Sequence, residues 1–292
     1  MRSFCTVGLI LFLGASRAFA GQPADSDSLP RSLPHGYSLR WHDFVTNIPD
    51  DVIRYGKTAF RQETIPEWIG ITALTVGFYL TDEQTYRESQ RWHNGSSRVE
   101  YWGNFFKEMG DGRSQFGLSA AFVAYGFVAG DNRALRTGSQ ITEVVLASGA
   151  VVQVLKHITG RRSPDGDPKY AAIWRPLPNQ IDYLKHVSSY DAFPSGHITT
   201  SMATVIVVAE NYPEYTWIKP VGYSLMVGIA VGMVNTGIHW YSDYPLGLAL
   251  GYAFGMIVAH PEGIDLAKDS DALTIYPVAR ESSIGVGMAL RF

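Results

Sequence analysis

Pro194-Ser195-Gly196-His197 leads directly into an apolar run at residues 198–209, and this junction is typical of the start of a helix. Ser195 is a favourable N-cap, and Gly196 allows a ligand to approach the backbone closely. Because the first turn of a helix offers unpaired N–H groups and the positive end of its dipole, the junction predicts an anion site. His197 can donate a proton to an anion held there. The same residues also fit an ordinary capped helix with an incidental histidine.

A cluster of cations lies upstream of this junction. Lys156 closes an earlier apolar run, and Arg161 and Arg162 follow it in a loop bounded by Gly and Pro. Cations at a helix C-terminus are expected for dipole reasons alone, but they also neutralise a phosphoryl group. We therefore take all three as candidate phosphate-binding residues, together with Ser195 and Gly196.

A histidine and an aspartate lie downstream. His239 and Asp243 are four residues apart, which puts them on one face of a helical turn. A carboxylate bonded to one imidazole nitrogen fixes the tautomer and leaves the other nitrogen free to attack. Alternatively, Asp243 caps a helix that begins near Pro245. With His197, the pair makes up the candidate catalytic set.

Six apolar stretches are predicted to be helices, because they are longer than ordinary strands and rich in Ala, Leu, Val and Met. They are residues 68–80, 116–129, 141–155, 198–209, 221–234 and 246–259. The chain ends differently, with a short β-prone segment at 273–278 and a strictly alternating one at 284–292. The sequence therefore predicts an all-α fold, a bundle of about six core helices, with a short C-terminal β-like hairpin.

The chain divides into four expected parts. Residues 1–20 are typical of a secretory signal, and the only cysteine, Cys5, lies within it, which removes cysteine chemistry from the mature chain. Residues 21–60 are a polar lead and an amphipathic helix at 50–60, which lies on a membrane surface or, more simply, docks on the core. Residues 61–261 are the helical domain, and residues 262–292 are the β-like tail.

A cleaved signal puts the mature chain on the periplasmic side of a bacterial envelope. A membrane span needs about 20 predominantly apolar residues, and none of the six stretches reaches that length cleanly. The mean hydropathy of −0.02 is also low for six spans. We therefore favour a non-spanning domain, with an integral inner-membrane protein whose site faces the periplasm as the alternative. The net charge of −3 argues against a nucleic-acid binder that works through bulk positive charge.

The three clusters resemble the signatures of the type 2 phosphatidic acid phosphatase superfamily, which also includes bacterial acid phosphatases and vanadium haloperoxidases. The family patterns are Lys-x6-Arg-Pro, then Pro-Ser-Gly-His, then Ser-Arg-x5-His-x3-Asp, and the resemblance covers residues 68–259, roughly. It implies an all-α bundle and a phosphohistidine mechanism that needs no metal or other cofactor.

The resemblance also implies a role for each residue. His239 would attack phosphorus, oriented by Asp243, and His197 would protonate the leaving oxygen. Lys156, Ser195 and the amide of Gly196 would hold the phosphoryl oxygens.

Two arginines of the family patterns are absent, and Gly232 stands where the third pattern has serine. Ser163 stands where the first pattern has arginine, and Met233 stands where the third has arginine. Arg161 or Arg162 could replace the first. We expect a phosphatase that hydrolyses a phosphate mono- or diester of a lipid-linked or small substrate outside the cytoplasm. The alternative is a weak or inactive phosphatase-fold protein that binds a phosphate or lipid head group.

Overall fold

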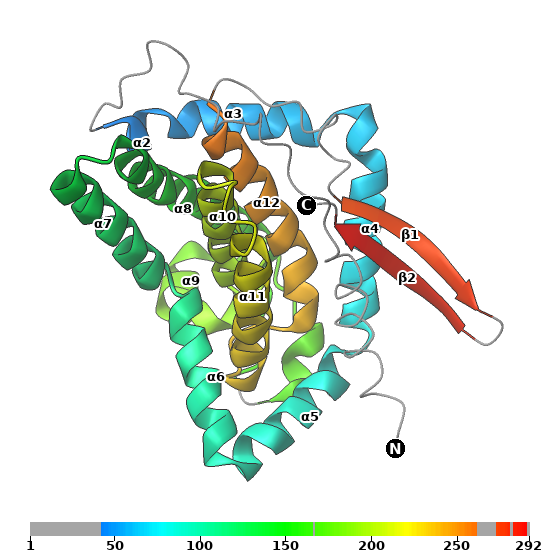
Figure 1. The fold of residues 1–292 in the computed structure, drawn as a ribbon. Helices are drawn as coiled ribbons and strands as arrows, with labels where there is room; N and C mark the ends of the chain where they lie inside the picture. The colour runs from blue at the N-terminus through cyan, green and yellow to red at the C-terminus, as the bar shows by residue number, and fades with distance from the viewer. Residues whose placement is uncertain (1–41, 166, 262–272, 281–282, 291–292) are drawn as a thin grey trace. The chain divides into compact units, whose positions relative to one another are not determined.

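Helices occupy most of residues 42–261 in the computed structural model, which describes residues 42–165, 167–261, 273–280 and 283–290 (Figure 1). The predicted all-α class is confirmed. The expected signal at 1–20 and most of the polar lead lie outside the described residues.

The helices and strands have the following bounds. The α-helices are α2 (Asp43–Thr46), α3 (Ile48–Ala59), α4 (Ile65–Tyr79), α5 (Asp82–Gly95), α6 (Ser97–Gly110), α7 (Gly112–Ala129), α8 (Asn132–Thr159), α9 (Gln180–Lys185), α10 (Gly196–Asn211), α11 (Ile218–Asn235) and α12 (Tyr244–Ala259). The 3-10 helices are η1 (Gln62–Thr64), η2 (Pro168–Ala172), η3 (Val187–Ser189) and η4 (Tyr241–Asp243). The strands are β1 (Leu273–Arg280) and β2 (Ser283–Leu290).

Each of the six predicted core helices is present, as α4, α7, α8, α10, α11 and α12. The amphipathic segment at 50–60 is also helical, as α3. Four of the α-helices were not predicted. α2 has only four residues, α5 and α6 are too polar to give an apolar run, and α9 lies between two of the predicted helices.

The core surrounds α10, which packs against α8 and α12 on one side and against α11 on another (Figure 1). Buried side chains of α8, α10 and α12 form one apolar cluster, which includes Ile141, Val207 and Phe254. A second cluster joins α10 to α11 and includes Ile206 and Met233. The start of α10, which carries the Ser-Gly-His motif, is therefore held by three neighbouring helices.

Glycines on α12 allow its backbone to approach α10 closely. A Cβ on Gly251 would lie 2.4 Å from the carbonyl oxygen of Thr199, and one on Gly247 would lie 3.0 Å from that of Ser195. Larger side chains would force the two helices apart. The contact brings the first turn of α10 beside the first turn of α12, and so brings Ser195 beside Asp243.

Several apolar helices expose much of their surface. α4 buries none of its residues, and at the end of α7 Phe127 and Val128 are 74% and 90% exposed. A helix that is apolar on all sides is normally covered, either by protein or by lipid. α8 and α11 are also long and apolar enough to cross a membrane, by length and composition.

The end of the chain forms the expected hairpin. β1 and β2 pair in an antiparallel register, with Leu273 opposite Leu290 and Arg280 opposite Ser283. The residues that connect this hairpin to α12 lie outside the described ranges.

Candidate active site

Three chain turns bring the predicted residues together. Lys156 lies in the last turn of α8, His197 in the first turn of α10, and Asp243 in η4 just before α12. The backbone N–H of Ser195 donates to the carbonyl of Asp243 at 3.0 Å, which joins two of these turns directly. Residues that are far apart in the sequence thus meet at one end of the central helices.

His239 and Asp243 form the expected pair. Nδ1 of His239 lies 3.3 Å from Oδ2 of Asp243, and the same oxygen accepts the backbone N–H of Trp240 at 2.8 Å. His239 is 1% exposed, and its Nε2 has no hydrogen-bond partner among the described residues. Burial lowers the pKa of His239 to about 3, with Lys156 acting in the same direction. The ring is therefore neutral at pH 7, with one nitrogen free to act as a nucleophile.

His197 faces His239 edge to face, with the ring centroids 5.5 Å apart. Burial lowers the pKa of His197 to about 3, and the nearby His239 and Lys156 add to the effect. An anion between the two rings would act in the opposite direction, because a negative charge favours the protonated imidazole. His197 is therefore suited to carry a proton only when an anion is bound.

The start of α10 offers groups that bind an anion. The side chain of Ser195 accepts the N–H of Ile198, so Ser195 is the N-cap that the sequence predicts. The amides of Gly196 and His197 in the first turn have no acceptor within the helix. Lys156 is buried, and its Nζ would lie 3.9 Å from a Cβ on Gly196. An ammonium and a helix N-terminus therefore adjoin the two histidines.

Arg161 is buried and bound to two carboxylates. Its Nη1 donates to the hydroxyl of Ser242 at 2.6 Å and to Oδ1 of Asp243, and its Nη2 donates to Oδ2 of Asp82 at 2.7 Å. The side chains of Arg161, Asp82 and Asp243 are all completely buried. We had expected Arg161 to contact phosphate, but in this structure its guanidinium is used to hold Asp243.

A left-handed turn sends Arg161 into this position. Gly160 ends α8 with φ of +56°, and a Cβ there would lie 1.9 Å from the carbonyl oxygen of Arg175. The backbone N–H of Arg175 also donates to the carbonyl of Gly160 at 3.0 Å. Only glycine fits both the conformation and the space.

Arg162 is also engaged elsewhere. Its guanidinium lies over the ring of Tyr170, 3.5 Å from the centroid, and 4.0 Å from Oδ2 of Asp165. Ser163 and Met233, which replace the two family arginines, are both buried. Neither Arg161 nor Arg162 therefore supplies the missing charge in this structure.

Three polar residues of the site were not predicted. Asp82 at the start of α5 and Ser242 in η4 complete the surroundings of Arg161. Asp191 lies 3.5 Å from Nζ of Lys156 and is the acidic partner of that lysine. Ser242 lies between His239 and Asp243, and Asp191 lies three residues before Pro194, so closeness to a recognised motif could have found both residues. Asp82 gives no such signal, because its partner lies 79 positions away.

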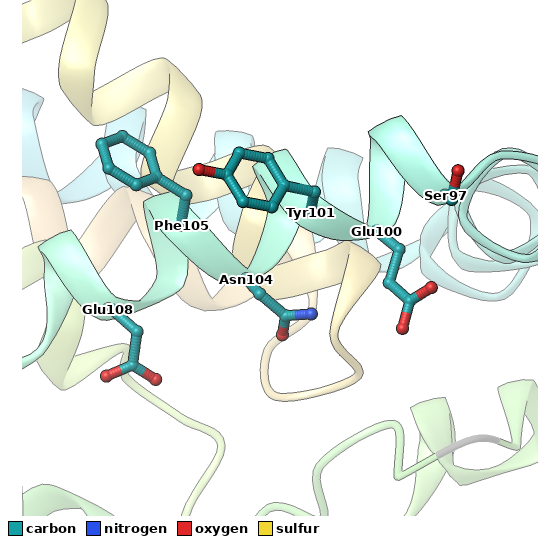
Figure 2. Close-up of a pocket in the computed structure, with 6 residues that line it drawn as sticks. All are labelled: Ser97, Glu100, Tyr101, Asn104, Phe105 and Glu108. Carbon is teal, nitrogen blue, oxygen red and sulfur yellow. The ribbon is translucent and has the colours of Figure 1, made fainter.

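The structure also has a shallow hollow on α6, away from the histidines. Ser97, Glu100, Tyr101, Asn104, Phe105 and Glu108 line it (Figure 2). Two carboxylates make this surface unsuitable for a phosphate group. Among the described residues, no group of three or more His, Cys, Asp or Glu side chains could hold a metal ion.

Comparison with known proteins identifies the domain. A model of the PAP2 superfamily matches residues 138–261, which include Lys156, both histidines and Asp243. This part of the chain belongs to the PAP2 superfamily. The resemblance found in the sequence motifs is therefore confirmed for the segment from α8 to α12, while α5 and α6 lie outside the matched PAP2 residues.

Two curated relatives and one solved structure are similar to this chain. The lipid A 1-phosphatases of Rhizobium johnstonii and Rhizobium etli are each 30% identical over 122 residues, which is 42% of this chain and 46% or 49% of theirs. The chain thus spans about half the length of these two relatives. A transmembrane PAP2 type phosphatidylglycerolphosphate phosphatase from Bacillus subtilis aligns with a TM-score of 0.44 and 15% identity, over 76% of this chain and 96% of that one.

Proposed function

We propose that this protein is a lipid phosphatase that works through a phosphohistidine at His239. The observation that carries the proposal is the environment of this side chain. Its Nδ1 faces Asp243, its Nε2 is buried and has no hydrogen-bond partner among the described residues, and the two histidine rings meet edge to face. A neutral imidazole that is fixed at one nitrogen and free at the other suits nucleophilic attack.

The reaction would proceed in two steps. In the first, Nε2 of His239 forms a bond to phosphorus, the bond from phosphorus to the alcohol oxygen breaks, and that oxygen takes a proton from His197. In the second, a water molecule loses a proton to His197 and attacks phosphorus, and the bond to His239 breaks. Inorganic phosphate leaves, and both histidines return to their starting state. This use of one residue as acid and then as base is ordinary general acid–base catalysis.

The phosphoryl oxygens would lie against the start of α10. Lys156 and the amides of Gly196 and His197 supply positive charge and donors there. Binding would compete with Asp191 for Lys156, since the two side chains are 3.5 Å apart. The negative charge of the substrate would also raise the pKa of His197, so that it carries the proton needed in the first step.

A lipid substrate is supported by the relatives and by the exposed surface. Two relatives carry the name lipid A 1-phosphatase. α4 and α7 expose large apolar side chains, among them Ile69, Phe127 and Val128, and exposed apolar patches mark membrane or protein interaction sites. These surfaces favour the membrane-bound alternative over the non-spanning domain that we favoured from the sequence. We propose a membrane-bound enzyme whose site faces the periplasm.

The test is phosphate release by the purified chain in detergent micelles. The substrates are phosphatidic acid, lipid A 1-phosphate, a polyprenyl diphosphate and p-nitrophenyl phosphate. We expect the wild type to release phosphate from at least one lipid, His239→Ala to release none, and His186→Ala to match the wild type, because His186 is an exposed residue paired with Asp182. Equal release by the wild type and His239→Ala would overturn the proposal.

The positions of the arginines favour a second candidate function, a protein that binds a phosphate head group without hydrolysing it. Arg161 and Arg162 are engaged elsewhere, and Ser163 and Met233 carry no charge. Removal of one preorganised donor typically costs about a hundredfold or more in rate. Binding of phosphate that is lost in Lys156→Ala, without turnover of any substrate, would establish this function instead.

A further inference from the structure

The groups behind His239 contain one more negative charge than positive charge. Arg161 is the cation, and Asp82 and Asp243 are the two carboxylates that share it. The backbone N–H of Ser242 donates to Oδ1 of Asp82 at 3.2 Å, and its hydroxyl donates to Oδ2. All of these groups are buried, so their interactions are not weakened by water.

The sharing of Arg161 matters for His239. A guanidinium bound to Asp243 alone would neutralise that carboxylate. In the proposed reaction, however, the His239 ring becomes positively charged when Nε2 bonds to phosphorus, and it then needs a full negative charge at Asp243. Asp82 binds Nη2 of the same guanidinium while Asp243 is bound by Nη1.

We propose that Asp82 is a positioning residue for the reaction, which acts by sharing Arg161 so that Asp243 keeps the negative charge that stabilises His239. The inference rests on the proposed function. Asp82 lies on α5, before residues 138–261, which match the PAP2 superfamily. The family match therefore gives Asp82 no role.

A purely structural role for Asp82 predicts something different. In that case the ion pair only fastens α5 to η4, and its loss lowers stability without a specific effect on the chemical step. The net charge behind His239 separates the two roles. With Asp82, Arg161 and Asp243 present the sum is −1, and with Asp82→Asn it is 0. With Asp82→Asn and Arg161→Gln together it is again −1.

The experiment measures kcat and KM for phosphate release by the full chain and five variants. Asp82→Asn is expected to lower kcat by about tenfold or more, with KM within about twofold, since one nearby charge commonly changes an ionisation equilibrium by that factor. Adding Arg161→Gln to Asp82→Asn is expected to raise kcat again. Adding Asp82→Asn to Asp243→Asn is expected to leave kcat at the value of Asp243→Asn alone. His186→Ala, at an exposed residue outside this cluster, is expected to match the wild type.

The outcomes are distinct. A kcat for Asp82→Asn that equals that of the wild type, or a further fall on adding Arg161→Gln, would overturn the role of Asp82 while leaving the phosphatase intact. A wild type that releases no phosphate would overturn both proposals. Should Asp82→Asn fail to fold, the double variant Asp82→Asn with Arg161→Gln decides the matter, because it removes one charge of each sign and keeps the sum at −1. A kcat within about fivefold of the wild type supports the inference, and a larger loss contradicts it.

Discussion

His239 Nδ1 lies 3.3 Å from Oδ2 of Asp243, and both side chains are buried. This contact sets the orientation of the imidazole, because the carboxylate accepts a hydrogen bond from Nδ1–H and leaves Nε2 as the nucleophile. The backbone N–H of Trp240 donates to the same oxygen and keeps the carboxylate in place.

Asp243→Asn should lower kcat by about a thousandfold, because the amide supplies no negative charge and favours the wrong tautomer of His239. KM should change little, since Asp243 does not contact the phosphoryl oxygens in the proposed mechanism. Steady-state kinetics with the best lipid substrate give both constants, and far-ultraviolet circular dichroism checks the fold. A loss smaller than tenfold would contradict the assigned role.

Activity should fall as the pH drops below about 6. Burial raises the pKa of Asp243 to about 6, although Arg161 acts in the opposite direction. Below that pH the carboxyl gains a proton and no longer stabilises a positive His239. The pKa of His239 itself is lowered to about 3, so the nucleophile stays neutral throughout this range. A plot of log kcat/KM against pH should therefore bend near 6, whereas a flat profile down to pH 4 would exclude Asp243 as the group responsible.

Gly160→Ala should destabilise the protein by at least about 2 kcal/mol, because alanine is strained at positive φ and its Cβ would collide with Arg175. Gly149→Ala is the matched control in the same helix. Nothing lies within 4 Å of a Cβ there, and alanine should stabilise α8 by about 0.5–1 kcal/mol. Thermal unfolding in detergent measures both changes, and equal midpoints for the two variants would refute this account of the turn.

The membrane fraction of cells should retain the protein after washing with sodium carbonate, and detergent should release it. Exposed apolar side chains on α4 and α7 are the physical reason, since lipid covers such surfaces at no hydrophobic cost. Release by carbonate alone would support the non-spanning domain instead.

The sequence was sufficient for the apolar helices and for the order of the site motifs. Runs such as 198–209 bury their side chains in one core, so their composition reports their structure directly. α5 escaped prediction because it buries only Asp82, Tyr86 and Ser89, and no periodic apolar signal results.

The position of Arg161 could not be predicted from its neighbours in the sequence. A cation after a helix C-terminus fits a phosphate ligand and an internal ion pair equally well. The choice depends on the left-handed turn at Gly160 and on Asp82, which belongs to a different helix. Long-range ion pairs of this kind carry no local pattern.

The most direct test of the central claim is to trap the covalent intermediate. The full chain is mixed with phosphatidic acid radiolabelled in its phosphate, or with another lipid phosphate that it hydrolyses, and the reaction is quenched in alkali within milliseconds. We predict label on the wild-type protein that survives alkali and is lost in acid, as expected for a phosphorus–nitrogen bond, with the same label in His186→Ala and none in His239→Ala. Label that persists in His239→Ala, or an active wild type that never becomes labelled, would contradict the mechanism.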